Sequence, residues 1–235
     1  MLKVELHTHT ADDPVDTIPH SAQDLIDRAA VLGYGALAIT LHERQFESQH
    51  ITAYARDRGI VLIRGIERTI DGRHVLLLNF TQAVEDLRTF EDLARLRRRE
   101  RGLVVAPHPF FPSPVALRGA LERHAELFDA VELNAMVVRG IDFNRRAEVW
   151  AALHGKPVVG NGDVHRLVQL GSTYSLVDVP PASDADSICE AIRVGRVRVE
   201  HRQLSWATAA RVMASIALDQ VLARAPWSVR TAQRR

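Results

Sequence analysis

The chain has 235 residues, of which 46% are hydrophobic and 25% charged, a profile typical of a globular protein with one barrel-sized domain or two small domains. Its formal net charge of +1 argues against a general affinity for nucleic acids or membranes. The single cysteine, Cys189, excludes an intrachain disulfide, and no apolar run approaches the roughly 18 residues that a membrane span needs. A strand-like pattern at the N-terminus leaves no room for a signal peptide, so we expect a cytoplasmic protein with no membrane partner and no disulfide-linked partner.

Strand-like and helix-like patterns alternate along the chain. Helices are predicted at 21–33, 83–102, 143–155 and 183–195, and each of these ends in a glycine. Strands are predicted at 2–7, 35–40, 60–67, 74–80, 103–106, 130–134, 157–160 and 174–179. Alternating strands and helices form a mostly parallel sheet, and no Pro/Gly/Ser-rich linker divides the chain. The pattern therefore favours a single α/β barrel.

A helical period returns after the last predicted strand, at residues 206–225. We expect residues 1–204 to form the barrel and residues 205–225 to form a closing helix packed on it. The segment 226–235, which ends in RTAQRR, is predicted to be a disordered basic tail. Cys189 falls in a predicted helix and is expected to be a buried structural thiol.

Histidines and carboxylates gather where the predicted strands end. In a β/α barrel the loops that follow the strands converge at one end, so these side chains are expected to lie together. Imidazole and carboxylate ligands suit Zn²⁺, Mn²⁺ or Fe²⁺, and the lack of spare cysteines excludes a thiolate site. The set is His7, His9, His42, Glu67, His108, Asp163 and His165, together with His74, which starts the strand predicted at 74–80.

Three common catalytic motifs are absent from the sequence. There is no G-x-S-x-G element, no G-x-x-x-x-G-K-[ST] loop and no G-x-G-x-x-G turn. Serine-nucleophile chemistry, P-loop nucleotide hydrolysis and dinucleotide-dependent redox chemistry are therefore disfavoured.

The ordered series HTHT, AITLHE, GIERT, RHVLLL, APHPF, VELNA and GNGDVH resembles the PHP family, named for polymerase and histidinol phosphatase. The resemblance covers roughly residues 2–200. It implies a distorted (β/α)7 TIM-like barrel, a single domain that binds two or three divalent metal ions (Zn, Mn or Fe).

The resemblance also implies which residues bind the metals. The first metal would be held by His7, His9, Glu67 and Asp163. Glu67 would bridge to a second metal completed by His74 and His108. A third metal would take His42, His165 and one residue of the loop 11–21.

That loop, ADDPVDTIPHS, departs from the commoner family pattern and leaves its ligand open. Asp13 is the preferred ligand and Asp12 the next, while Asp16 and His20 are further candidates. Leu41 is a second departure, because the family usually has an aspartate directly before the histidine that corresponds to His42. Its loss is expected to change the orientation of His42 without removing a metal.

The resemblance implies a metal-dependent phosphoesterase, either a phosphomonoesterase or a phosphodiesterase, with a metal-bridging hydroxide as nucleophile. Catalytic roles fall on Glu67, Asp163 and His165, and Arg44 and Arg139 are expected to bind substrate phosphate. The general acid stays open among His20, His42 and His165. The expected partner is a small phosphorylated metabolite, a nucleotide or an oligonucleotide end.

Two other functions were compared with this one. A non-catalytic PHP module with a structural or regulatory role is the main alternative, and metal analysis would distinguish it. A C–N hydrolase of the amidohydrolase type also begins with H-x-H, but it usually needs a carboxylated lysine after a middle strand. Only Lys3 and Lys156 occur in the chain, and neither has that position.

Overall fold

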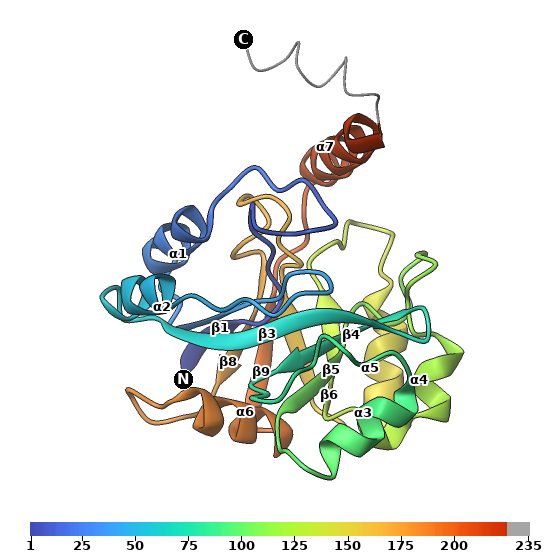
Figure 1. The fold of residues 1–235 in the computed structure, drawn as a ribbon. Coiled ribbons are helices and arrows are strands. Elements are labelled where there is room, and N and C mark those ends of the chain that lie inside the picture. Colours follow the sequence, from blue (N-terminus) through green and yellow to red (C-terminus); the bar gives the residue numbers. More distant parts are fainter. Residues whose placement is uncertain (225–235) are drawn as a thin grey trace.

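Strands and helices alternate around one barrel in the computed structural model, which describes residues 1–224 (Figure 1). The strands are β1 (Leu2–Glu5), β2 (Ala36–Ile39), β3 (Val61–Ile70), β4 (Arg73–Leu78), β5 (Leu103–Ala106), β6 (Ala130–Asn134), β7 (Val158–Asn161), β8 (Thr173–Val177) and β9 (Val197–His201). The helices are α1 (Ala22–Val31), α2 (Gln49–Arg56), α3 (Phe90–Arg97), α4 (Gly119–Arg123), the 3-10 turn η1 (Ala125–Leu127), α5 (Asn144–Leu153), α6 (Ala185–Arg193) and α7 (Trp206–Arg224). The tail predicted at 226–235 lies outside the described residues.

The strands form a single sheet in the order β7-β6-β5-β4-β3-β2-β1-β8-β9, curled into a nearly closed, TIM-like barrel. Strands β1, β2 and β3 are parallel, as are β5, β6 and β7. Strand β4 runs antiparallel between β3 and β5, and β8 runs antiparallel between β1 and β9. The prediction of a TIM-like α/β barrel is confirmed, but the sheet is mixed where a mostly parallel one was expected.

A two-residue turn explains the reversed direction of β4. Asp71 and Gly72 both have positive φ angles, 47° and 72°, and connect the paired residues Ile70 and Arg73. An Asp-Gly pair with two positive φ angles forms the tight turn of a β-hairpin, so no helix separates β3 from β4. As a result, the first residues of β4 lie at the same end of the barrel as the last residues of its two antiparallel neighbours, β3 and β5.

Side-chain caps set where α1 and α3 begin. The Ser21 side chain accepts from the backbone N–H of Asp24, and the Asp24 carboxylate accepts from the N–H of Ser21, which starts α1. Thr89 and Asp92 make the same reciprocal cap before α3. The helix predicted at 83–102 is therefore shorter than expected, because this cap lies in its middle. The helices and strands predicted by residue range do not include α2, α4 and β9.

Apolar side chains close one end of the barrel. Ile188, Cys189 and Ile192 of α6 pack with the barrel-facing residues Val4 and Ala36 in one buried cluster. Figure 1 shows α6 below the strands, at the end where β1 begins. Other clusters fill the space between the sheet and its outer helices, α1 and α2 on one side and α3, α4 and α5 on the other. Only the opposite end of the barrel is left for polar chemistry.

The helix predicted after the barrel forms as α7, above the site-bearing end in Figure 1. Its Ala209 and Val212 are buried, whereas Trp206 and Met213 are more than half exposed. Its role as a closing helix packed on the barrel stays a prediction. Within residues 1–224, no helix is both long enough and apolar enough to cross a membrane.

Side-chain contacts close the barrel where no backbone ladder does. In residues 1–224, no ladder joins β7 to β8 or β9. Instead, the buried Ser175 hydroxyl accepts from the N–H of Gly160 at 3.0 Å and donates to its carbonyl at 3.1 Å. A Cβ atom at Gly160 would lie only 2.6 Å from a methyl group of Val199, so glycine permits this close approach.

Replacing Ser175 tests this closure. We expect Ser175→Ala to lower the free energy of unfolding by about 1–3 kcal/mol, because both backbone groups of Gly160 lose a buried partner. Urea unfolding would measure the change. Ser187→Ala, at an exposed serine of α6, is the control and should change the free energy by less than about 0.5 kcal/mol. Equal stability of the two variants would contradict a closing role for Ser175.

The packing of α6 yields a chemical prediction. Cys189 is 2% exposed, and burial raises the pKa of its thiol to about 12. Because the thiolate is the reactive species, a thiol reagent at mildly alkaline pH should label the unfolded chain and spare the native one. Absorbance with Ellman's reagent, with and without denaturant, would measure this. Rapid labelling of the native protein would contradict the burial.

Candidate metal centre

A backbone pairing brings the two ends of the barrel sequence together. The N–H of His9 donates to the carbonyl of Val164, and the N–H of Val164 donates to the carbonyl of His7, both at 3.1 Å. Thr8 and Val164 thus form a parallel bridge beyond the ends of β1 and β7. Residues on either side of a bridge partner share one face, so His7 and His9 lie beside Asp163 and His165.

Glu67 on β3 lies at the centre of the cluster and is 1% exposed. Both of its carboxylate oxygens face imidazoles from neighbouring strand ends. Oε2 lies 3.3 Å from His7 Nε2, 3.5 Å from His9 Nε2 and 3.1 Å from His42 Nε2. Oε1 lies 2.6 Å from His74 Nδ1 and 3.2 Å from His108 Nε2. His74 reaches the cluster because β4 is reversed and begins at this end.

Asp163 contributes a second carboxylate on the solvent side. Its Oδ1 lies 3.4 Å from His7 Nε2, 3.7 Å from His9 Nε2 and 3.4 Å from His165 Nδ1. The Asp163 side chain is 22% exposed, whereas His7 and His9 are fully buried, so the cluster opens to solvent at this residue. Asp163 has φ 48° and His108 has φ 34°, a left-handed backbone conformation that residues other than glycine rarely adopt.

The unpaired nitrogens of the cluster fit metal ions. Nε2 of His7 and Nε2 of His9 are buried and have no hydrogen-bond partner among the described residues. Burying such atoms is costly unless something else satisfies them, and both face the carboxylates of Glu67 and Asp163. The described residues contain four groups of three side chains, and within each group the three potential ligand atoms lie within 4.8 Å of one another. The groups are His7, His9 and Glu67; His7, His108 and Asp163; His42, Glu67 and His74; and His9, His42 and His165. This donor set suits divalent metal ions.

Asp13 lies behind the histidines, on the side away from Glu67. Its Oδ2 is 2.9 Å from His9 Nδ1 and 3.0 Å from His42 Nδ1, and it accepts from the N–H of His42 at 3.0 Å. Its Oδ1 accepts from the N–H groups of Val15 and Asp16, both at 2.9 Å. The geometry therefore does not favour Asp13 as the direct ligand that the sequence suggested.

The other loop candidates lie differently. Asp16 Oδ2 is 3.1 Å from His165 Nε2, on the partly exposed side of the cluster. His20 is buried, with Nε2 2.9 Å from the carbonyl of His9. Asp12 is exposed and accepts from the hydroxyl of Thr10. Of the four candidates, Asp16 has the carboxylate best placed to bind the same metal ion as His165.

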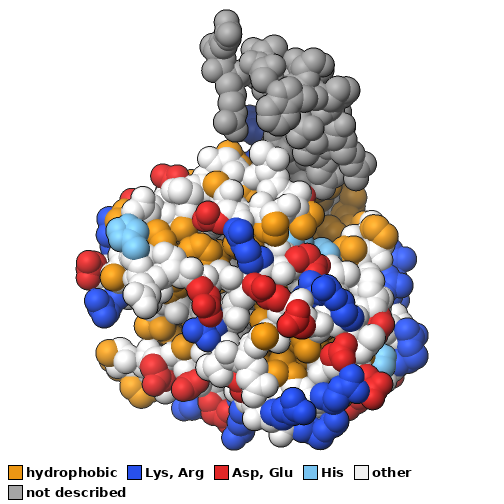
Figure 2. Space-filling view, in the orientation of Figure 1, with side chains coloured by type: hydrophobic (Ala, Val, Ile, Leu, Met, Phe, Trp, Pro, Cys, Tyr) orange, Lys and Arg blue, Asp and Glu red, His pale blue; other side chains and the backbone are white. Residues whose placement is uncertain are grey.

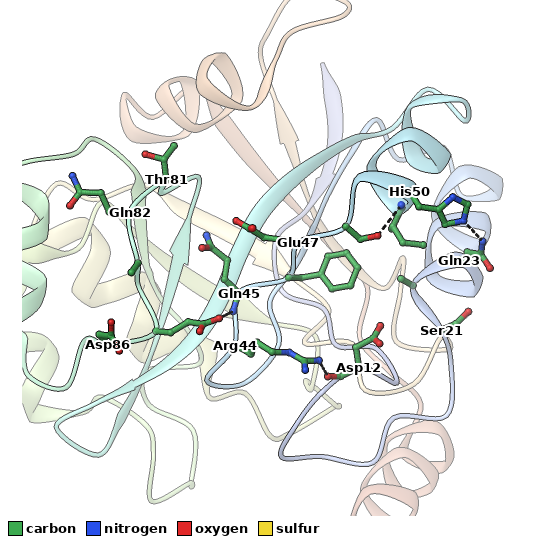
Figure 3. A pocket seen from close by; sticks show the side chains of 16 residues that line it. Asp12, Ser21, Gln23, Arg44, Gln45, Glu47, His50, Thr81, Gln82 and Asp86 are labelled. Atoms are coloured by element: carbon green, nitrogen blue, oxygen red, sulfur yellow. Dashed lines mark hydrogen bonds between the residues drawn. The ribbon is translucent and has the colours of Figure 1, made fainter.

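The two arginines predicted to bind phosphate are both exposed. Arg44 donates to the carbonyl of Asp12, and the two residues line a groove of about 940 Å³ outside the cluster (Figure 3). Arg139 lies in the turn between Val138 and Ile141. Neither is among the residues that the structure brings together around Glu67.

Several buried polar residues escaped the sequence reasoning. Glu132 of β6 is fully buried, with Oε2 2.8 Å from His7 Nδ1 and 3.0 Å from the Asn161 amide. Glu5 of β1 is also fully buried, and burial raises the pKa of its carboxyl to about 8. The position of these two glutamates within short, otherwise mainly apolar strands was the sequence feature that could have predicted their burial. Leu41 is fully buried among apolar side chains, so the carboxylate beside His42 comes from Asp13 instead.

Comparisons with known proteins agree with this arrangement. A family model described as PHP-associated matches residues 142–197. An error-prone DNA polymerase from Pseudomonas fluorescens is 34% identical over 175 residues, which are 63% of this chain and 16% of that protein. A PolC-type DNA polymerase III from Streptococcus pyogenes is 41% identical over 68 residues, 29% of this chain and 5% of that protein. The chain thus corresponds to a small part of these polymerases.

Solved structures share the fold at low identity. A two-domain protein from Bacteroides vulgatus, containing a predicted PHP-like metal-dependent phosphoesterase, superposes with a TM-score of 0.66 at 17% identity, over 86% of this chain and 65% of that one. PsfC from Pseudomonas syringae gives 0.65 at 18% identity, over 93% and 97%. The lesion-specific endonuclease EndoQ from Pyrococcus furiosus gives 0.60 at 16% identity, over 84% and 57%.

Fold and cluster together define a TIM-like barrel with a histidine- and carboxylate-rich metal-binding end. The family-model match and the shared fold support the resemblance to the PHP family that the sequence motifs indicate.

Metal binding should depend on pH in a defined direction. Burial opposes the charged imidazolium, yet Glu67 and Asp13 raise the pKa of His42 to about 11, and Asp163 and Asp16 raise that of His165 to about 10. Both exceed the ordinary value of 6.5, so these imidazoles hold protons at neutral pH without metal. A ligating imidazole must lose its proton, so Zn²⁺ affinity should rise about tenfold per pH unit for each proton released.

Chelator competition between about pH 6.5 and pH 8.5 would measure this dependence. Proton release can be counted separately by calorimetry in buffers of different ionisation enthalpy. An affinity that does not change with pH would show that the histidines near Glu67 do not take part in binding.

Proposed function

We propose that the protein is a metal-dependent hydrolase of phosphate esters, either a phosphomonoesterase or a phosphodiesterase. The observation that carries this proposal is the position of Glu67, whose two oxygens lie 2.6 to 3.5 Å from nitrogens of five imidazoles. A carboxylate shared in this way suits a bridge between two cations. The names of the structural neighbours, a predicted phosphoesterase and an endonuclease, support hydrolysis of a phosphate ester.

We assign the ligands as the sequence predicted, with one revision. His7, His9, Glu67 and Asp163 would hold a first ion, and Glu67, His74 and His108 a second. A third ion would be held by His42 and His165, with Asp16 in place of Asp13. The revision rests on the contact of 3.1 Å between Asp16 and His165 and on the full set of hydrogen bonds that Asp13 already accepts.

Bound divalent ions would supply Lewis acidity to the phosphate and lower the pKa of a water molecule toward neutrality. The chain's own residues provide the rest. The buried Glu67 holds negative charge between the imidazoles, and Asp163 presents a carboxylate where the cluster meets solvent. Without metal, Asp163 and Asp16 raise the pKa of His165 to about 10 against the effect of burial, and we propose this residue as the proton donor to the leaving oxygen when the third position is empty.

The substrate is proposed to be a small phosphorylated metabolite, a nucleotide or an oligonucleotide end, with Arg44 and Arg139 contacting phosphate. One observation favours a small substrate. On the face drawn in Figure 2, acidic side chains are interspersed with basic ones. The groove beside Arg44 is lined by the acidic residues Asp12, Glu47, Glu85 and Asp86 (Figure 3). Their charge repels a long polyanion. Another observation favours an oligonucleotide, because an endonuclease Q of this fold was solved with a 27-mer duplex that has an abasic lesion.

A non-catalytic PHP module remains the second candidate function. It is favoured by the polymerase relatives, in which the matched region is a small part of a long chain. Such a module would keep the barrel and could bind metal without turning over a phosphate ester.

Activity of metal-loaded protein tests the proposal. With Mn²⁺, we expect hydrolysis of p-nitrophenyl phosphate or its bis ester, and His9→Ala should lower kcat/KM by about a thousandfold, since a metal site supplies several kcal/mol of transition-state stabilisation. His124→Ala, at the end of α4 outside the cluster, should keep wild-type activity. A panel of phosphomonoesters, cyclic nucleotides and short oligonucleotides would then define the substrate.

The two candidate functions give different results. If the wild-type protein binds metal but hydrolyses no member of the panel, the module is favoured over the enzyme. If hydrolysis is unchanged in His9→Ala, the assigned centre is not the source of the activity.

A further inference from the structure

Around the rings of His7, His9 and His42, the carboxylates of the centre fall into two sets. Glu67 and Asp163 face Nε2 atoms, including the two buried nitrogens that have no hydrogen-bond partner. Asp13 and Glu132 face Nδ1 atoms on the opposite sides of the same rings. We call Glu67 and Asp163 the inner carboxylates, and Asp13 and Glu132 the outer carboxylates.

Asp13 is fully used by protein donors. Its side chain has no exposed surface, and its two oxygens accept from three backbone N–H groups, those of Val15, Asp16 and His42. The same carboxylate lies 2.9 Å from His9 Nδ1 and 3.0 Å from His42 Nδ1. The Asp13 carboxylate therefore has few lone pairs left for a metal ion, but it contacts the rings of both His9 and His42 and can fix their orientation.

Glu132 is used in the same way on the other side of the cluster. Oε1 accepts from the N–H of His108 and from the Asn134 amide, both at 3.2 Å. Oε2 accepts from the Asn161 amide at 3.0 Å and lies 2.8 Å from His7 Nδ1. The side chain is fully buried, so water does not compete for these contacts.

A neutral imidazole has one N–H and one lone pair, and the hydrogen bond at one nitrogen selects which nitrogen has the lone pair. A carboxylate on Nδ1 places the proton there and leaves the lone pair of Nε2 pointing at the inner carboxylates. Without the outer carboxylate, the ring can rotate or carry its proton on Nε2, and either change blocks a metal at that nitrogen.

We infer that Asp13 and Glu132 are positioning residues that hold His9, His42 and His7 by their Nδ1 atoms and direct the Nε2 atoms at the metal positions. This inference rests on the proposed metal centre and adds two residues to it. It also explains why Leu41 is compatible with a working site, because Asp13 supplies the carboxylate for His42.

Metal titration of conservative variants tests the inference. Asp13→Asn and Glu132→Gln keep the size of the side chain and remove its charge. We expect each to weaken Zn²⁺ binding about 10- to 100-fold in chelator competition, with the same number of ions bound at saturation. Asp57→Asn, at an exposed aspartate that ends α2 away from the cluster, is the matched control and should bind Zn²⁺ like the wild type.

Two spectroscopic readouts do not depend on turnover. In the zinc-loaded wild-type protein, ¹⁵N NMR should show protonated Nδ1 and metal-bound Nε2 for His7, His9 and His42. In Asp13→Asn the signals of His9 and His42 should change and that of His7 should not, and Glu132→Gln should give the reverse. Circular dichroism and thermal melting of each metal-free variant would show that it folds.

The outcomes separate this inference from the proposed function. Loss of one bound ion at saturation in Asp13→Asn would make Asp13 a direct ligand and overturn its positioning role. Unchanged affinity and unchanged imidazole signals in both variants would also overturn the inference, even if the enzyme hydrolyses phosphate esters. A wild-type protein that binds zinc but has no hydrolase activity would reject the proposed function and leave the positioning role supported or rejected by the titration alone.

Discussion

The bridge between Thr8 and Val164 is the constraint on which the rest of the site depends. It joins the segments that follow β1 and β7, more than 150 residues apart in the chain, through a pair of backbone hydrogen bonds at 3.1 Å. Because side chains alternate along an extended segment, one register brings all four flanking residues to the same face. A slip of one residue would turn His7 and His9 away from Asp163. Backbone pairing, more than any side-chain contact, therefore assembles the centre.

The sequence predicted the parts of the site that follow from the ends of strands. His42 and His108 follow short strand-like runs, and the pairs His7/His9 and Asp163/His165 lie where two other strands end. A barrel alone therefore brings these residues together. His74 was placed correctly at this end, although its reason, the tight turn at Asp71–Gly72, was not recognised. The roles of Asp13 and Asp16 could not be separated in this way. Both lie in an irregular loop whose path depends on tertiary hydrogen bonds that have no local sequence signature.

Buried polar residues inside strands were the larger omission. Glu132 and Ser175 lie in short strands of the barrel, where sequence patterns favour apolar residues. Each is present because it satisfies specific polar groups, the Nδ1 atom of His7 in one case and the backbone of Gly160 in the other. Such partners can only be identified once the barrel is closed. The fold is thus specified mainly by apolar periodicity, whereas the fine geometry of the centre depends on a few buried hydrogen bonds.

The left-handed backbone at His108 and Asp163 has a consequence for the evolution of this chain. Both residues sit in a conformation that glycine would adopt with less strain, so glycine there would relieve strain while removing the side chain that faces Glu67 or its histidines. Selection for a more stable fold and selection for the centre therefore act in opposite directions at these two positions. Ion binding shifts this balance, because any ligand that binds only the native state adds its own binding free energy to stability. The supply of metal in the cell would then set how much backbone strain this barrel can tolerate.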